Sequence, residues 1–209
     1  MSTFLLSIVI PVHNEEKNID HLLTRIRKSA DQYTYELIFV DDGSTDQTLN
    51  LLRKAAESDS NIKILSFTRN FGHQMALSCG YTAATGDCLI TIDADLQDPP
   101  EIIPSMVEKW QAGAEVVYAK RKTRDDSLFK KLTAFWFYRV LNFLSDTPIP
   151  EDVGDYRLQD KKVTAYLLKL PEHHRFLRGL VAWGGFTQQT VEFNRDKRYA
   201  GVTHYTLSK

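Results

Sequence analysis

The stretch Leu5–Glu16 reads LLSIVIPVHNEE, an uncharged, largely apolar run that ends abruptly in a polar cluster. A continuous run rich in Ile and Val is typical of a strand buried on both faces of a parallel sheet. The same pattern recurs in Tyr35–Asp42 (YELIFVDD) and in Cys88–Asp95 (CLITIDAD). The sequence therefore predicts three buried strands, each of which ends in polar side chains.

Helical patterns separate these strands. Ile19, Leu22, Leu23 and Ile26 recur at the three- and four-residue spacing of a helix face. Further elements are expected as helices over 47–57 and 74–84 and from Pro99-Pro100 onward, and as strands over 62–67 and 116–119. Because strand and helix alternate, we expect an α/β fold, with an open, mostly parallel sheet flanked by helices on both faces.

The composition is that of an ordinary globular protein. The chain has 209 residues, 43% hydrophobic and 25% charged, which excludes collagenous, disordered and disulfide-scaffold classes. Its 26 basic and 27 acidic residues nearly cancel, whereas proteins that bind nucleic acid through phosphates are usually basic. Nucleic acid is therefore not expected as a partner.

No membrane-spanning segment or secretion signal is expected within the chain. The longest apolar runs, Leu5–Val12 and Leu132–Tyr138, are shorter than the ~20 residues that span a bilayer. The first residues lack the basic n-region of a signal peptide. The two cysteines, Cys79 and Cys88, are interpreted as small buried hydrophobes in a reducing compartment.

Acidic residues gather where the strands are predicted to end. In open α/β sheets, ligands bind beyond the carboxyl ends of the strands. Three polar clusters fall there: His13-Asn14-Glu15, Asp41-Asp42 and Asp93-Ala94-Asp95. Mg²⁺ or Mn²⁺ bound with a nucleotide would relieve the repulsion between these acids, and Gln97 would support the metal or a water on it. The alternative is that these residues only form turns and cap helices.

The glycine-rich phosphate loops GxGxxG and GxxxxGK[ST] are absent from the sequence. Phosphates would then be held by metal and basic side chains rather than by a helix N-terminus. This absence disfavours dehydrogenases and P-loop NTPases.

Four segments together resemble glycosyltransferase family 2, which has the GT-A fold. They are VIPVHNEE (9–16), VDDGSTDQT (40–48), RNFGHQMAL (69–77) and TGDCLITIDADLQDPPE (85–101). The resemblance implies a Rossmann-like nucleotide-sugar-binding region over residues 1–120. It also implies an acceptor-binding, membrane-proximal elaboration of the same catalytic domain over 121–209.

The resemblance assigns roles residue by residue. The nucleotide-sugar would be bound by Pro11, Asn14, Glu15, Asp41, Asp42, Arg69 and Asp93. The metal, Mg²⁺ or Mn²⁺, would be held by Asp93, Asp95 and Gln97. His13 stands where many relatives carry a tyrosine.

Three later segments narrow the resemblance to polyprenyl-phosphate glycosyltransferases, with the bactoprenol glucosyltransferases most alike and dolichol-phosphate mannose synthase related. They are GDYRL (154–158), RFLRGLVAWGGF (175–186) and RYAGVTHY (198–205). This branch implies inverting transfer from a UDP-sugar, of glucose or a related hexose, to undecaprenyl phosphate. The implied location is the cytoplasmic face of the bacterial inner membrane, with transmembrane helices following residue 209.

By the same resemblance, Asp155, Asp95 and Arg121 are the catalytic candidates. The acceptor phosphate would be bound by Arg121, Arg124 and Arg198. A phosphate monoester is already an anion near neutral pH, so little base catalysis is needed and Asp155 would orient the acceptor. The alternative for Asp155 is a structural ion pair with Arg157 or Arg175.

The remaining features leave alternatives open. The aromatic segment 128–144 after the basic stretch 120–131 fits either an interfacial helix or a core helix. Most other arginines, and His173 and His174, are expected at the surface. The alternatives to the lipid acceptor are a saccharide acceptor and a non-catalytic nucleotide-sugar-binding module. A homo-oligomer stays open.

Overall fold

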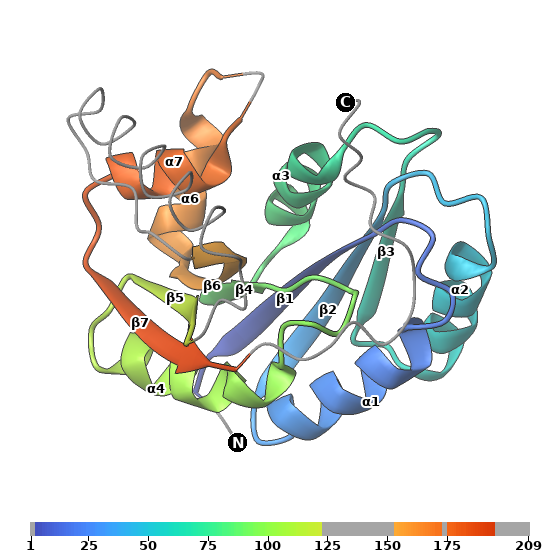
Figure 1. Cartoon of the computed structure of the whole chain (residues 1–209), viewed down its shortest axis with the longest axis horizontal. Helices are drawn as coiled ribbons and strands as arrows, with labels where there is room; N and C mark the ends of the chain where they lie inside the picture. Colours follow the sequence, from blue (N-terminus) through green and yellow to red (C-terminus); the bar gives the residue numbers. More distant parts are fainter. Residues whose placement is uncertain (1–2, 123–152, 173–174, 195–209) are drawn as a thin grey trace, which may run out of the picture.

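The computed structural model of the chain describes residues 3–122, 153–172 and 175–194 (Figure 1). In chain order its elements are β1 (Leu5–Val12), α1 (Ile19–Ala30), β2 (Thr34–Asp41), α2 (Thr48–Ser58), β3 (Ile62–Ser66), α3 (His73–Ala83), β4 (Cys88–Thr91), a 3-10 turn (Pro100–Ile102), α4 (Ile103–Gln111), β5 (Val116–Arg121), β6 (Val153–Asp160), α6 (Lys161–Lys169), α7 (Leu177–Trp183) and β7 (Gln188–Phe193).

These elements build one seven-stranded sheet of order β3-β2-β1-β4-β6-β5-β7. Within it, β6 runs antiparallel to both of its neighbours, β4 and β5, while the other pairings are parallel. The predicted α/β fold with a mostly parallel sheet is confirmed. The strands β6 and β7 are additions that the apolar pattern did not predict, and β6 lies between β4 and β5 although it follows both in the chain.

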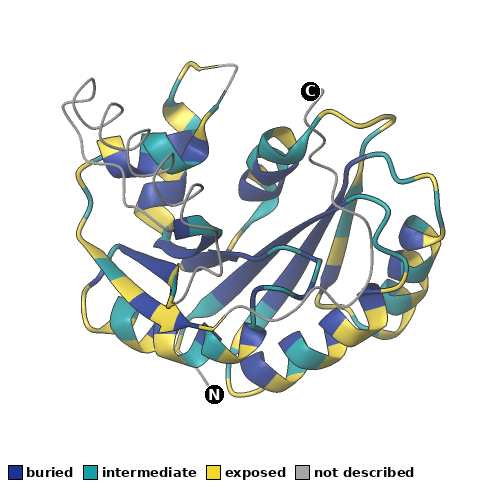
Figure 2. Ribbon diagram, in the orientation of Figure 1, coloured by how far each residue is buried: buried dark blue, intermediate teal, exposed yellow. Residues whose placement is uncertain are grey.

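Helices cover both faces of the sheet, as predicted. Figure 1 shows α3, α6 and α7 on one face, while α1, α2 and α4 lie on the other. Successive residues of each strand serve opposite cores: Ile8 and Ile10 join the core under α1, α2 and α4, while Val9 joins the core under α3, α6 and α7. Figure 2 shows the resulting buried sheet between helices whose outer faces are exposed.

The strand register sets the level of the polar clusters. In β1 and β2, Val12 pairs with Asp41, and Asp41 pairs in turn with Ser66 of β3. On the other side, Thr91 of β4 pairs with Arg157 of antiparallel β6. Continued two residues beyond Thr91, the same register places Asp93 level with Asp155 of β6. The antiparallel strand therefore brings a late segment of the chain to the Asp93 loop.

None of the helices in the described ranges has both the length and the apolar character needed to cross a membrane. Both cysteines are free; Cys88 is buried as predicted, and Cys79 is partly exposed. The aromatic segment 128–144, Arg124, Arg198, His173 and His174 lie outside the described residues.

Close packing of α3 on the sheet depends on a glycine. A Cβ atom built at Gly80 would lie 2.3 Å from Cγ1 of Val9 in β1, far inside the contact distance. Gly80 and Val9 are both fully buried, so neither has room to move away. The helix therefore approaches the strand as closely as it does because position 80 has no side chain.

We predict that Gly80→Ala lowers the free energy of unfolding by about 1–3 kcal/mol, because overpacking a close-packed core costs this much. Urea unfolding monitored by circular dichroism measures the change. Thr82→Ala, at an exposed position of the same helix, is the matched control and should leave stability nearly unchanged. Equal stability of Gly80→Ala and the control would show that α3 does not pack as described.

Candidate active site

Two loops at the carboxyl edge of the sheet interlock. The amide of Asn14 donates to Oγ of Ser44 (3.0 Å), and the amide of Thr45 donates back to Oδ1 of Asn14 (2.8 Å). The amide of Glu15 donates to Oγ1 of Thr48 (2.8 Å). These bonds hold the loop after β1 against the loop after β2. The structure thus brings together the residues predicted to line a nucleotide, with Pro11 buried at the end of β1 beside them.

The carboxylates of Asp41 and Asp42 are buried and organise the neighbouring loops. The two oxygens of Asp42 accept the amides of Phe71 (2.7 Å) and Gly72 (2.9 Å). Asp41 accepts the hydroxyl of Ser66 (3.0 Å). Both acids therefore stabilise the neighbouring loops by accepting hydrogen bonds. Their contact with a nucleotide base stays a prediction.

The loop that carries Arg69 is fixed by the same turn. Gly43 has a φ of +67°, and a Cβ built there would lie 2.4 Å from the carbonyl carbon of Arg69. Only glycine satisfies both the left-handed backbone and this close approach. Arg69 is exposed, with its guanidinium 4.0 Å from the centre of the Phe71 ring. Arg69, which is predicted to bind the nucleotide, therefore lies in the loop that packs against the Asp42-Gly43 turn.

The loop after β4 carries the Asp-x-Asp pair in a strained turn. Oδ1 of Asp95 accepts the backbone amide of Gln97 (3.1 Å). Between them, buried Leu96 has a φ of +61°. Within the described ranges, Leu96 and Asn14 are the only non-glycine residues with positive φ, and both lie in loops at this edge. Such backbone strain clusters at functional sites, where the surrounding structure holds it in place.

The acids of this loop suit a divalent cation. The Asp93 side chain is 40% exposed and faces the site. The packed atoms around the carboxyl still remove part of its hydration and raise its pKa above the ordinary value; the charges of Asp95 and Asp155 raise it further, whereas those of His73 and Arg121 lower it. A cation would remove this unfavourable crowding of negative charge.

The donor count also fits a metal shared with a substrate. In the described part of the chain, no three His, Cys, Asp or Glu side chains are gathered closely enough to enclose an ion. A cation held by the two carboxylates of this loop, Asp93 and Asp95, would leave its other positions to phosphate oxygens and water. Mg²⁺ is commonly bound in this way, by one or two carboxylates plus substrate phosphates.

Asp155 of β6 lies at the centre of a polar cluster. Its Oδ2 is 3.3 Å from Nε2 of His73 and 3.3 Å from Nε2 of Gln74, both in the first turn of α3. Its Oδ1 is 3.3 Å from Nη1 of Arg157. Nη2 of Arg178, from α7, is 3.8 Å from Oδ2. One carboxylate therefore connects β6 to α3 and α7.

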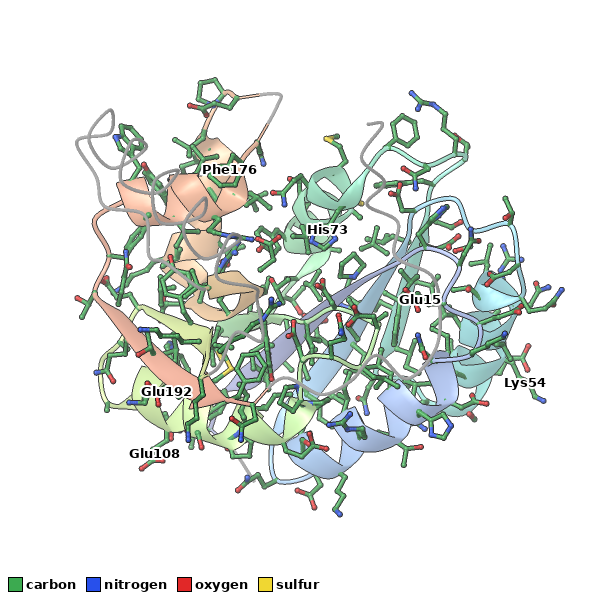
Figure 3. All side chains as sticks on the ribbon, in the orientation of Figure 1. Glu15, Lys54, His73, Glu108, Phe176 and Glu192 are labelled. Atoms are coloured by element: carbon green, nitrogen blue, oxygen red, sulfur yellow. The ribbon has the colours of Figure 1, made fainter. Side chains whose placement is uncertain are left out.

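His73 joins this cluster to the Asp-x-Asp loop. Its Nε2, which is 3.3 Å from Oδ2 of Asp155, also lies 3.8 Å from Oδ1 of Asp93. Figure 3 shows His73 on the side of α3 that faces the sheet. The acidic loop after β4 and the cluster around Asp155 are therefore two halves of one site.

Arg157 is the buried partner of Asp155. Its side chain is fully buried, and each guanidinium nitrogen has a partner: Nη1 bonds Asp155, Nη2 bonds the Tyr81 hydroxyl (2.7 Å) and Nε bonds Oε1 of Gln159 (3.1 Å). The predicted alternative of an Asp155–Arg157 ion pair is thus observed. The pairing with Arg175 is wrong, because that guanidinium donates to backbone carbonyls of its own segment.

The surroundings keep Asp155 ionised. Burial alone would raise the pKa of its carboxyl, but the hydrogen bond from His73 and the charge of Arg157 outweigh burial and hold the pKa well below its usual range. A carboxylate stabilised in this way accepts protons poorly. The geometry therefore favours an orienting role for Asp155 over that of a general base.

Arg121, the predicted catalytic and acceptor-binding arginine, ends β5 beside this cluster. Its Nη2 lies 3.9 Å from Oδ1 of buried Asp98. The same nitrogen would be 3.7 Å from a Cβ built at Gly154, the residue before Asp155. Arg121 is thus brought to the site, whereas Arg124 and Arg198 lie outside the described residues.

Three site residues were not predicted: His73, Gln74 and Arg178. The first two stand in the RNFGHQMAL segment, just after Gly72, where a helix begins. A histidine in the first turn of a helix at the sheet edge was the available signal. Arg178 was interpreted as a surface charge, and no pattern in its own segment indicates a partner at position 155.

The fold and this site define a class of enzyme. Mannosyltransferase PcManGT from Pyrobaculum calidifontis, solved in complex with GDP-Man and Mn²⁺, superposes with a TM-score of 0.68 at 21% identity, over 96% of this chain and 58% of that one. Glucosyl-3-phosphoglycerate synthase from Mycobacterium tuberculosis, solved with Mn²⁺, UDP and phosphoglyceric acid, gives 0.67 at 21% identity, over 95% and 72%. The chain therefore has the fold of the GT-A glycosyltransferases.

The family follows from the sequence match. The model of "Glycosyl transferase family 2" matches residues 7–168, so the chain belongs to glycosyltransferase family 2.

Two relatives that cover most of the chain are also glycosyltransferases. The chain is 50% identical to the uncharacterized glycosyltransferase YkcC of Bacillus subtilis, over 97% of this chain and 64% of that protein. It is 43% identical to the bactoprenol glucosyl transferase of Shigella phage SfX, over 96% and 67%. The chain thus spans about two thirds of the length of these relatives.

We predict that Asp155→Asn lowers the free energy of unfolding at pH 7 by about 3 kcal/mol, because it leaves the buried Arg157 charge uncompensated. The folded-state pKa of Asp155 lies below its ordinary value of 3.8, so its contribution is complete above that value and is lost as pH falls below it. The stability gap between wild type and variant should therefore narrow from pH 5 to pH 3.

Urea unfolding at each pH measures this gap. Glu57→Gln, at an exposed position of α2, serves as the control for removal of one carboxylate. A gap that stays constant from pH 5 to pH 3 would contradict the ion pair.

Proposed function

We propose that the chain is the catalytic domain of an inverting, metal-dependent glycosyltransferase. It would transfer glucose or a related hexose from a UDP-sugar to undecaprenyl phosphate or a similar polyprenyl phosphate. The observation that carries this proposal is the pairing of an acidic Asp93–Asp95 loop with an arginine-rich cluster around Asp155, joined through His73. One half suits a metal-bound diphosphate, and the other suits an anionic acceptor.

The donor side of the reaction depends on the loops after β1, β2 and β4. The interlocked loops that carry Asn14 and Asp42 would hold the nucleotide. Asp93 and Asp95, supported by Gln97, would hold Mg²⁺ or Mn²⁺, which when bound offsets the charge of the departing diphosphate. Both solved structures compared above contain Mn²⁺, which supports a divalent metal here.

The acceptor side needs little proton transfer. The second pKa of a phosphate monoester is about 6, so its oxygen is already a nucleophile near neutral pH. That oxygen would bond the anomeric carbon from the face opposite the diphosphate while the bond to the diphosphate breaks. Asp155 would orient the groups around it, and Arg121, with Arg124 and Arg198, would neutralise the acceptor phosphate.

The choice of acceptor is supported by the relatives. Several proteins 43% identical to this chain are named bactoprenol glucosyl transferases or homologues, and bactoprenol phosphate is a polyprenyl phosphate. Such an acceptor resides in a membrane, so we place the reaction at the cytoplasmic face of the bacterial inner membrane. Residues 1–120 would serve mainly the donor, and residues 121–209 mainly the acceptor.

The test is a transfer assay with separate donor and acceptor panels. Purified chain is incubated with Mn²⁺, UDP- or GDP-sugars, and undecaprenyl phosphate in detergent, and the lipid fraction is analysed by mass spectrometry. A lipid-linked hexose formed from a UDP-sugar supports the proposal. Transfer to free saccharides alone would establish the saccharide-acceptor alternative, and UDP binding without any turnover would establish a binding module.

We predict that Asp95→Asn reduces metal-dependent transfer by at least about a hundredfold, because one of the two carboxylates for the metal is lost. The melting temperature should stay close to that of the wild type, since Asp95 is partly exposed. Asp20→Asn, on the exposed face of α1, is the control. Full Mn²⁺-dependent turnover of Asp95→Asn would refute the assignment of the metal to this loop.

A further inference from the structure

The guanidinium of Arg178 reaches the site, but not all of its N–H donors have an acceptor there. Its Nη2 lies 3.8 Å from Oδ2 of Asp155, which is longer than a hydrogen bond. Its Nε is buried and has no hydrogen-bond partner among the described residues. The side chain is 25% exposed, so it is not sealed inside the protein. Arg178 is therefore a charged group at the site with an unused hydrogen-bond donor.

The carboxylate of Asp155 is already committed to other donors. Oδ2 is closer to His73 and Gln74 than to Arg178, and Oδ1 is taken by Arg157. Arg157 is fully buried with each of its nitrogens bonded, so it cannot reach a ligand. One negative charge thus faces two guanidinium groups, and the surplus positive charge belongs to the exposed one, Arg178.

Packing fixes Arg178 in place. The amide of the preceding residue, Leu177, donates to Oε1 of Gln74 (3.2 Å), whose Nε2 in turn bonds Asp155. Leu177 and Val181 are fully buried in the core under α3, α6 and α7. The backbone that carries Arg178 is therefore positioned by the same network as Asp155.

An anion is the ligand that completes this arrangement. A planar guanidinium with unused N–H donors matches two oxygens of a phosphate. Arg178 extends from α7 to Asp155, with Nη2 3.8 Å from Oδ2, whereas the diphosphate is assigned to the Asp93–Asp95 loop after β4. The phosphate nearest to Arg178 would thus be separate from a diphosphate held at that loop.

We propose that Arg178 is a phosphate-binding residue of the active site and that it receives the phosphate of the acceptor. The assignment rests on the proposed function. It adds an acceptor contact from α7 to those expected from Arg121, Arg124 and Arg198. Asp155 and Gln74 act as positioning residues that hold Arg178 ready for this phosphate.

The experiment compares Arg178→Gln and Arg178→Lys with Arg175→Gln, a matched control in the same segment whose guanidinium donates to the nearby backbone carbonyls of Glu172 and Leu170. Steady-state transfer from a UDP-sugar to undecaprenyl phosphate gives KM for each substrate, and calorimetry gives Kd for UDP with Mn²⁺. For Arg178→Gln we expect KM for undecaprenyl phosphate to rise about tenfold or more, with Kd for UDP changed by less than about twofold.

Arg178→Lys should show a smaller rise in the same KM, because lysine keeps the charge and loses the planar fork. If Arg178→Gln does not fold, the lysine variant alone tests the assignment. An unchanged KM for undecaprenyl phosphate in Arg178→Lys would then overturn it. Weakened UDP binding with an unchanged acceptor KM would overturn it as well, by placing Arg178 on the donor diphosphate. Wild type that never transfers to undecaprenyl phosphate refutes the proposed function itself, whereas active wild type with an equally active Arg178→Gln refutes only this inference.

Discussion

The buried ion pair between Asp155 and Arg157 is the interaction on which the site depends. Two opposite charges inside a core are tolerated only when their remaining hydrogen bonds are satisfied. Here the surroundings give each guanidinium nitrogen of Arg157 a partner and give Asp155 donors from α3 and β6. The same bonds that make the pair tolerable also fix His73 and Gln74. Stability and active-site geometry are therefore coupled through one carboxylate.

The antiparallel strand β6 makes this coupling possible. A sheet built only of parallel strands would place only residues that follow strands at its carboxyl edge. By running the other way, β6 brings Asp155 to that edge just as it enters the sheet, level with the loop after β4. The arginine Arg157, two residues after Asp155 on β6, is thus brought close to the acidic loop after β4. The net charge of −1 conceals a site with an acidic half and a basic half.

Comparison with solved enzymes separates what the fold contributes from what the site contributes. At 21% identity the sheet is retained, as the TM-scores of 0.67 and 0.68 show. A fold shared so widely does not by itself define a reaction. The function therefore resides in the loops: the strained turn at Leu96, the acids beside it, and the cluster around Asp155.

The sequence by itself determined the parallel part of the sheet and the position of its acidic edge, because apolar runs such as Leu5–Val12 report burial directly and the clusters after them can only fall at strand ends. Only the tertiary structure decided β6 and its partners. One face of β6 carries Asp155, Arg157 and Gln159, of which Arg157 and Gln159 are fully buried, so burial there leaves no apolar signal. Their partners come from distant segments: Gln74, which donates to Asp155, is separated from it by 81 residues. A polar residue is stable inside only when its partners surround it, and that condition exists only in the folded chain.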